Sequence, residues 1–305
     1  MDRKPAAARL LTAALAALAL PLAFGGAGAV DLSAIHADRW LAPGADQAYL
    51  VEVGRAAFRT PLTLGGQAAR AGVACESCHQ GGRSNPDFFF PGLSGAPGTA
   101  DVTSSLFSSH RDDGIDNPKP IPDLGGPKAR LKVNQDPASP ALKGFIHGLV
   151  TEEFDGAEPP PAVLAGLAAY VRALSPAACP PEARRPLRIR DYVEDSRRAA
   201  VAAAGALDRG DPAAAAFLIE AARTPLGLID ERFDQPLSAR PRAVLKAADL
   251  DLAAIAEDVR AHRPHARERL AVWIARSADW AGPVEAAEGQ SLFNRDRLAA
   301  AGPKP

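Results

Sequence analysis

The chain has 305 residues, of which 47% are hydrophobic, so it can build a sizeable core and does not have the composition of a disordered protein. Its formal net charge is −1, which gives no reason to expect a nucleic acid as a partner. Alanine and proline are common and aromatic residues make up only 6%, which favours an all-α fold with proline-rich loops over a β-sheet fold.

The first 29 residues have the features of a secretory signal peptide. A basic start precedes an apolar run over residues 10–24, and residues 27–29 form an Ala-Gly-Ala pattern that suits a signal peptidase. We therefore expect a cleaved leader and a periplasmic protein, with an uncleaved membrane anchor as the alternative. No later segment reads as apolar enough to span a membrane, so no membrane span is expected in the mature chain.

Two of the three cysteines lie in one short motif, CESCH, at residues 75–79. The pattern C-x-x-C-H is typical of covalent haem attachment. The thiols of Cys75 and Cys78, three positions apart on one helical turn, each bond a haem vinyl group, and His79 meets the iron as proximal ligand. A zinc site needs more ligands and a thioredoxin-like pair needs a βαβ context. The motif predicts a single haem c and leaves Cys179 unpaired.

Two predicted helices flank this motif. The first covers residues 47–58 and has Gly54 and Phe58 four residues apart on one face; the second covers residues 161–174. The apolar stripe of the second helix consists of Leu164, Leu167, Tyr170, Val171 and Leu174. These patterns resemble those of the class I cytochrome c family, whose first and last helices cross at a small glycine. The resemblance implies a monohaem cytochrome c domain at about residues 30–178, with long irregular loops.

A second resemblance covers roughly residues 45–178. The stretch from Gly54 to Leu124 is similar to the bacterial di-haem cytochrome c peroxidase and MauG-like family. The sequence FIHG at residues 145–148, followed by EEF at 152–154, resembles a degenerate form of that family's aromatic-x-His-Asp-Gly loop. Those proteins carry two haem motifs, whereas this chain has one, so their two-haem relay cannot be built within it.

The distal ligand of the iron has several candidates. The one methionine, Met1, belongs to the leader, which excludes His/Met coordination. His147 lies 68 residues after His79 and shortly before the last helix, near the position of the sixth ligand in class I cytochromes c. It is therefore the first candidate and His110 the second, with an open or water-bound site as the third alternative.

The choice of distal ligand decides the function. Two histidine ligands give a low-potential electron-transfer centre, because a thioether ligand is what raises the potential. An open face admits peroxide and requires an acid–base group, for which Glu152 and Glu153 are the nearest candidates in the sequence. We expect single-electron transfer with a redox partner protein as the leading function. A peroxidase-type or MauG-like oxidant is the alternative, and a haem-based sensor or assembly subunit is the third.

The long segment after the motif is rich in glycine, proline and aspartate. A loop of this length in a compact domain is usually functional, and we expect it to cover the haem edge. Arg83 is a candidate partner of a haem propionate. An oxygen-rich cluster follows in the sequence, made of Asp112, Asp113, Asp116 and Asn117. We expect a solvated turn there. The alternative is a calcium site, since the related peroxidases use calcium.

The C-terminal third reads as a linker at residues 179–187 followed by a bundle of four or five helices at residues 188–305. Pro212, directly after an aspartate, is predicted to begin one helix, and Pro283 is predicted to lie at the beginning of the last one. Arginines in and after the linker are either a docking patch for an acidic redox partner or a solvated segment.

Overall fold

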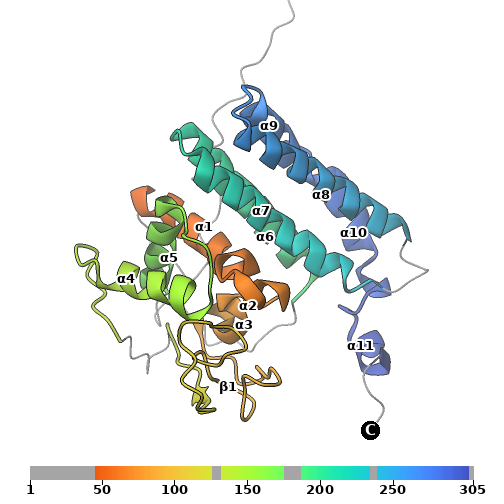
Figure 1. The fold of residues 1–305 in the computed structure, drawn as a ribbon. Helices are drawn as coiled ribbons and strands as arrows, with labels where there is room; N and C mark the ends of the chain where they lie inside the picture. Colours follow the sequence, from red (N-terminus) through yellow and green to blue (C-terminus); the bar gives the residue numbers. More distant parts are fainter. Residues whose placement is uncertain (1–44, 126–131, 175–186, 234–238, 302–305) are drawn as a thin grey trace, which may run out of the picture.

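The structure is a computed structural model, and it describes residues 45–125, 132–174, 187–233 and 239–301 (Figure 1). The predicted leader, Cys179 and most of the predicted linker lie outside these residues. Within them the fold is mainly helical, and the one sheet is a two-residue antiparallel pairing of β1 (Thr99–Ala100) with β2 (Lys119–Pro120). The prediction of an all-α fold is confirmed at this level.

The N-terminal part has three longer helices and several short turns. The elements, in chain order, are α1 (Ala45–Arg59), η2 (Pro61–Thr63), α2 (Gly66–Arg70), α3 (Cys75–Cys78), η3 (Gln80–Gly82), α4 (Ala141–Gly148), the π-helical turn η4 (Leu149–Glu153) and α5 (Pro161–Ala173). The two predicted flanking helices correspond to α1 and α5 to within two residues. α5 begins on a proline, which needs no backbone donor at the first helical position.

Helices α1 and α5 cross at two glycines with their backbones in close contact. A Cβ atom added to Gly54 would lie 1.9 Å from the carbonyl oxygen of Gly166, and one added to Gly166 would lie 2.8 Å from the nitrogen of Gly54. No other residue type allows this approach. Beside the crossing, the rings of Phe58 and Tyr170 pack with centroids 5.2 Å apart. The predicted crossing is present, although the sequence pattern identified only one of its two glycines.

The described residues of the C-terminal part, 187–233 and 239–301, contain six helices, more than the four or five expected. They are α6 (Ile189–Asp208), α7 (Pro212–Asp230), α8 (Ala239–Arg260), α9 (Ala266–Ala275), α10 (Ser277–Ala286) and α11 (Arg295–Ala301), with a short turn η6 (Glu288–Gln290) before the last. The predicted start of α7 is confirmed, because the Asp211 side chain accepts the N–H of Ala214 at 2.9 Å. The prediction at Pro283 is wrong: this proline lies inside α10, whose buried face continues from Trp280 to Val284.

The two parts share one hydrophobic core. A single cluster of buried side chains extends from Tyr49 in α1 to Ala287 after α10. Helix α6 is buried at every position from 199 to 206, and all of these residues except Val201 are alanine or glycine. Such small side chains let α6 approach both α7 and α1, and α1 thus lies between α5 and α6 (Figure 1). The C-terminal helices are therefore packed onto the N-terminal part.

Among the helices of the described ranges, α7 alone is long and apolar enough to cross a membrane by length and composition. This differs from the expectation that no segment after the leader reaches that hydropathy. Much of α7 is buried inside the fold, where it packs between α6 and α8. A core helix of this kind is apolar because it is enclosed by protein.

Candidate cofactor-attachment site

The C-x-x-C-H motif forms the single helical turn α3. The backbone N–H of His79 donates to the carbonyl of Cys75 at 2.8 Å, and the Ser77 hydroxyl accepts the N–H of Ala74 at 3.0 Å. Cys75 and Cys78 stand one turn apart on the same side of this helix, and neither is in a disulfide. The turn thus presents two unpaired thiols with the spacing that two thioether bonds require.

Burial controls the chemistry of the two thiols. It raises the pKa of Cys75 to about 12, with a smaller contribution from the neighbouring Cys78, and it raises the pKa of Cys78 to about 12 as well. Both groups are therefore protonated near neutral pH. A structural zinc site would need further ligands, and within the described residues no group of three His, Cys, Asp or Glu side chains includes these two thiols.

The ring of His79 is oriented by a residue far away in the sequence. Its Nδ1 lies 3.0 Å from the carbonyl oxygen of Pro122, and its ring centroid lies 6.4 Å from that of Phe58. Burial lowers the pKa of His79, although the Pro122 carbonyl and Asp123 oppose the shift, so the neutral ring is favoured. A neutral ring that donates from Nδ1 to a carbonyl keeps Nε2 as a lone-pair donor, as metal-binding histidines do.

The segment that provides this carbonyl is held across the motif by further bonds. The backbone N–H groups of Leu124 and Gly125 both donate to the carbonyl of Gly82 at 3.1 Å. The guanidinium of Arg83 pairs with Asp123 at 2.7 Å. Arg83, predicted as a propionate partner, therefore has a carboxylate partner within the protein and fixes the segment that orients the histidine.

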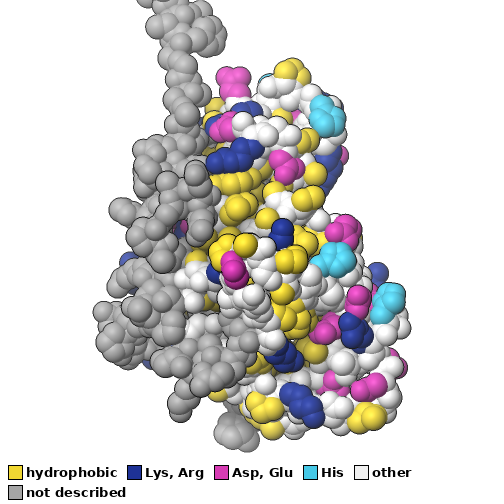
Figure 2. Space-filling view, turned by 90° about the vertical axis from the view of Figure 1, so that its left-hand side faces the viewer, with side chains coloured by type: hydrophobic (Ala, Val, Ile, Leu, Met, Phe, Trp, Pro, Cys, Tyr) yellow, Lys and Arg dark blue, Asp and Glu magenta, His cyan; other side chains and the backbone are white. Residues whose placement is uncertain are grey.

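Two apolar clusters meet at the cysteines. The side chain of Cys75 packs against the main core and also against a second cluster beneath the long loop, and Cys78 packs against the second cluster. The second cluster consists of Leu64, Ala68, Val73, Phe88, Leu93, Ala100, Phe107, Ile121 and Phe154. Hydrophobic side chains are also visible among charged ones on the face seen from the side of α4 (Figure 2). These surroundings fit a large, flat apolar group bound to the two cysteines.

The two candidate distal histidines each pair with a carboxylate. His147, on α4, places Nε2 2.6 Å from the Glu158 carboxylate, and the exposed His110 places Nδ1 2.8 Å from the Asp155 carboxylate. His110 thus keeps Nε2 for a metal, whereas His147 engages the same nitrogen that a ligand would use. Both distal assignments stay predictions.

The two candidate acid–base residues differ in environment. Glu152 pairs with Arg111 near the surface, and its backbone carbonyl accepts the Ser108 hydroxyl at 2.7 Å. Burial raises the pKa of Glu153, against the opposing charges of Arg111 and Lys132. One carboxylate oxygen of Glu153 is buried and has no hydrogen-bond partner among the described residues. Of the two, Glu153 has the perturbed carboxyl that proton-transfer groups commonly show.

The aspartates for which calcium was the alternative to a solvated turn accept backbone N–H groups nearby. Asp112 and Asp113 each accept a backbone N–H two residues further on, at 3.0 and 2.9 Å, and the N–H of Asn117 donates to the Asp101 carboxylate at 2.9 Å. Within the described part of the chain, no three His, Cys, Asp or Glu side chains come together as metal ligands. Calcium at these residues stays a prediction, because its ligands in proteins also include backbone carbonyls, asparagine and water.

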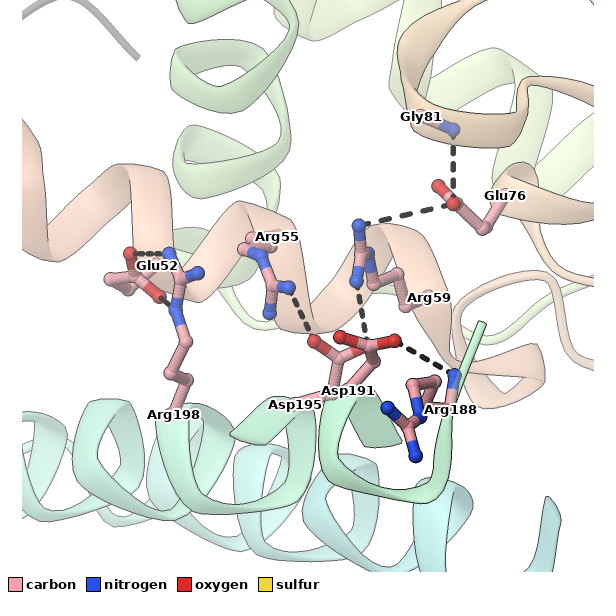
Figure 3. Close-up of polar contacts among 9 residues, drawn as sticks. All are labelled: Glu52, Arg55, Arg59, Glu76, Gly81, Arg188, Asp191, Asp195 and Arg198. Atoms are coloured by element: carbon pink, nitrogen blue, oxygen red, sulfur yellow. Dashed lines mark hydrogen bonds and ion pairs between the residues drawn. The ribbon is translucent and has the colours of Figure 1, made fainter. Parts of the chain in front are cut away.

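Glu76, inside the motif, links the turn to the rest of the molecule (Figure 3). Its Oε1 accepts the N–H of Gly81 at 3.0 Å and lies 3.9 Å from the guanidinium of Arg59. Burial raises the pKa of Glu76, and Arg59 opposes this shift. Sequence reasoning found neither this link nor the Pro122 carbonyl, because both depend on contacts between distant segments and no local pattern marks them.

Comparisons with models of protein families, with curated proteins and with solved structures found no match to this chain. The functional argument therefore depends on the motif and on the geometry around it.

Proposed function

We propose that this protein attaches one haem c covalently through Cys75 and Cys78, with His79 as the proximal iron ligand. The observation that carries the proposal is the position of His79, which directly follows a turn with two unpaired thiols and is oriented by the Pro122 carbonyl. When bound, the haem supplies a one-electron iron couple. Apolar clusters lie on both sides of the turn, and the Arg83–Asp123 pair holds the orienting segment in place.

On this basis we propose single-electron transfer in the periplasm, with a redox partner protein, as the function. The presence of one haem motif in the chain supports a carrier over the two-haem relay of the related peroxidases. One observation favours a second candidate, a peroxidase-type oxidoreductase: the half-buried Glu153 carboxyl, with its raised pKa and its unpartnered oxygen, suits a group that moves a proton.

The spin state of the ferric holoprotein separates these functions. For a carrier we expect a low-spin optical and EPR spectrum in the wild type, and a change to high spin in either His147→Ala or His110→Ala. A high-spin wild type that neither substitution alters would exclude histidine as the distal ligand.

In that case the reaction with peroxide tests the enzyme. We expect Glu153→Gln to slow this reaction at least about 100-fold, because general acid–base groups contribute at least about that factor to a rate. Glu194→Gln, a matched change on the exposed face of α6, should leave the rate unaltered. Equal rates in the two variants would exclude a proton-transfer role for Glu153.

A further inference from the structure

Charged side chains are enclosed where α1 meets α6, and they lead from the C-terminal helices to the cysteine turn (Figure 3). Asp195 of α6 forms ion pairs with both Arg55 and Arg59 of α1, the second at 2.6 Å. Arg59 also faces Oε1 of Glu76 at 3.9 Å, and the same oxygen accepts the N–H of Gly81 at 3.0 Å. Arg59 is therefore shared between a carboxylate of the bundle and a carboxylate of the haem motif.

The same interface contains a second ion pair that serves as an internal reference. Arg198 of α6 binds Glu52 of α1 through both ends of its guanidinium, with Nε 2.9 Å from the carboxylate. This pair is as well enclosed as the first, since the side chains of Arg198 and Glu52 are 5% and 11% exposed and those of Arg55 and Asp195 are 6% and 17% exposed. No contact with Glu76 is seen for this pair in the described structure.

The position of Arg59 decides how much of the Glu76 charge acts on the cysteine turn. Nη1 of Arg59 binds Asp195 at 2.6 Å, whereas Nη2 of Arg59 stays 3.9 Å from the Glu76 carboxylate, so the guanidinium lies closer to Asp195 than to Glu76. The Glu76 carboxylate is thus only partly compensated. The side chains of Arg59 and Glu76 are 26% and 27% exposed, so solvent screens their charges only in part. Such a charge affects a redox group bound to the neighbouring residues.

We propose that Asp195 is a positioning residue for the haem site, and that through Arg59 and Glu76 the C-terminal helices lower the reduction potential of the haem. This inference rests on the proposed attachment of haem at Cys75 and Cys78. A carboxylate near the iron favours the ferric state, because that state carries one more positive charge. When Asp195 loses its charge, Arg59 is released toward Glu76, the negative charge at the turn is compensated, and the potential moves in the positive direction.

The test is a spectroelectrochemical titration of holoproteins. We expect the midpoint potential of Asp195→Asn to be more positive than that of the wild type. Asp195→Glu, which keeps the charge, should recover at least half of the difference. Glu52→Gln removes one carboxylate charge from the same interface, about two helical turns from Arg59 along α1. It should shift the potential less than half as far as Asp195→Asn does. A shift in Asp195→Asn no larger than that in Glu52→Gln would overturn the proposal.

A second pair of variants distinguishes positioning from a direct effect of charge. Because Asp195 acts through Glu76 in this account, the Asp195→Asn shift should fall by at least half in a Glu76→Gln background. Equal shifts in both backgrounds would leave only a direct effect and contradict the positioning role.

If Asp195→Asn does not fold, Glu76→Gln alone is still informative. It should shift the potential in the positive direction by more than Glu52→Gln does, and equal shifts would overturn the inference. A wild type without covalent haem would refute the haem proposal and this inference together. A wild type with haem but with the wrong pattern of shifts refutes only the inference.

Discussion

Replacing Gly54 with alanine is expected to destabilise the protein by at least about 3 kcal/mol, at the upper end of the cost of overpacking. The added Cβ would lie 1.9 Å from the carbonyl oxygen of Gly166 and 2.7 Å from Cβ of Tyr170. The first of these atoms belongs to the backbone of α5, so no side-chain rotation relieves the clash and the two helices must separate. The free energy of unfolding, measured by urea denaturation and circular dichroism, tests this expectation.

Gly144 in α4 provides the matched control. It is exposed, and a Cβ atom there would meet nothing within 4 Å. Because alanine costs less conformational entropy than glycine in a helix, Gly144→Ala should stabilise the protein by about 0.5–1 kcal/mol. If Gly54→Ala stayed within about 1 kcal/mol of the wild type, the close crossing of α1 and α5 would be contradicted.

The second large effect is expected for Asp195→Ala, which should lower the free energy of unfolding by about 3–5 kcal/mol. The substitution removes the carboxylate that the guanidiniums of Arg55 and Arg59 share at the enclosed α1–α6 interface. Two like charges then face each other with less compensation. Asp279→Asn is the control, because its ion pair with Arg276 is 62–72% exposed and such pairs contribute about 0–1 kcal/mol. Similar losses in the two variants would contradict the role of the interface.

Asp195 also predicts the direction of acid sensitivity. Burial opposes its ionisation, but the charges and hydrogen bonds of Arg59 and Arg55 outweigh burial and lower the pKa of the folded state below its usual value. In the unfolded chain the pKa is about 3.9. The stabilisation is therefore complete above that pH and is lost as the pH falls through the lower folded-state pKa. Below about pH 4, the wild type should lose stability more steeply than Asp195→Asn.

Local signals in the sequence account for several helices in both parts of the chain. Helix α5 was predictable because a proline begins it and an apolar stripe follows, and α7 was predictable from the aspartate cap at Asp211. The CESCH turn needs only the spacing of its own residues. The prediction at Pro283 failed because a proline usually marks a helix start. Here α10 begins before Pro283 and continues beyond it, since its buried face around Trp280 packs against the core.

The remaining features depend on contacts between distant segments. The carbonyl that orients His79 belongs to Pro122, 43 residues away, and Asp195 lies 136 residues from Arg59. The joining of the two predicted domains into one core depends on the alanine-rich face of α6, and alanine gives little contrast between buried and exposed faces. Patterns of hydrophobicity along one helix cannot identify the partner of that helix.

The central claim is the covalent attachment of haem, and the mass of the denatured holoprotein tests it most directly. The protein should be matured in cells that assemble c-type cytochromes and compared with a Cys75→Ser/Cys78→Ser variant prepared in the same way. We predict that the wild-type chain carries the added mass of one haem after denaturation and that the variant carries none. A wild-type chain of unmodified mass, with the thiols of Cys75 and Cys78 both open to alkylation, would contradict the account.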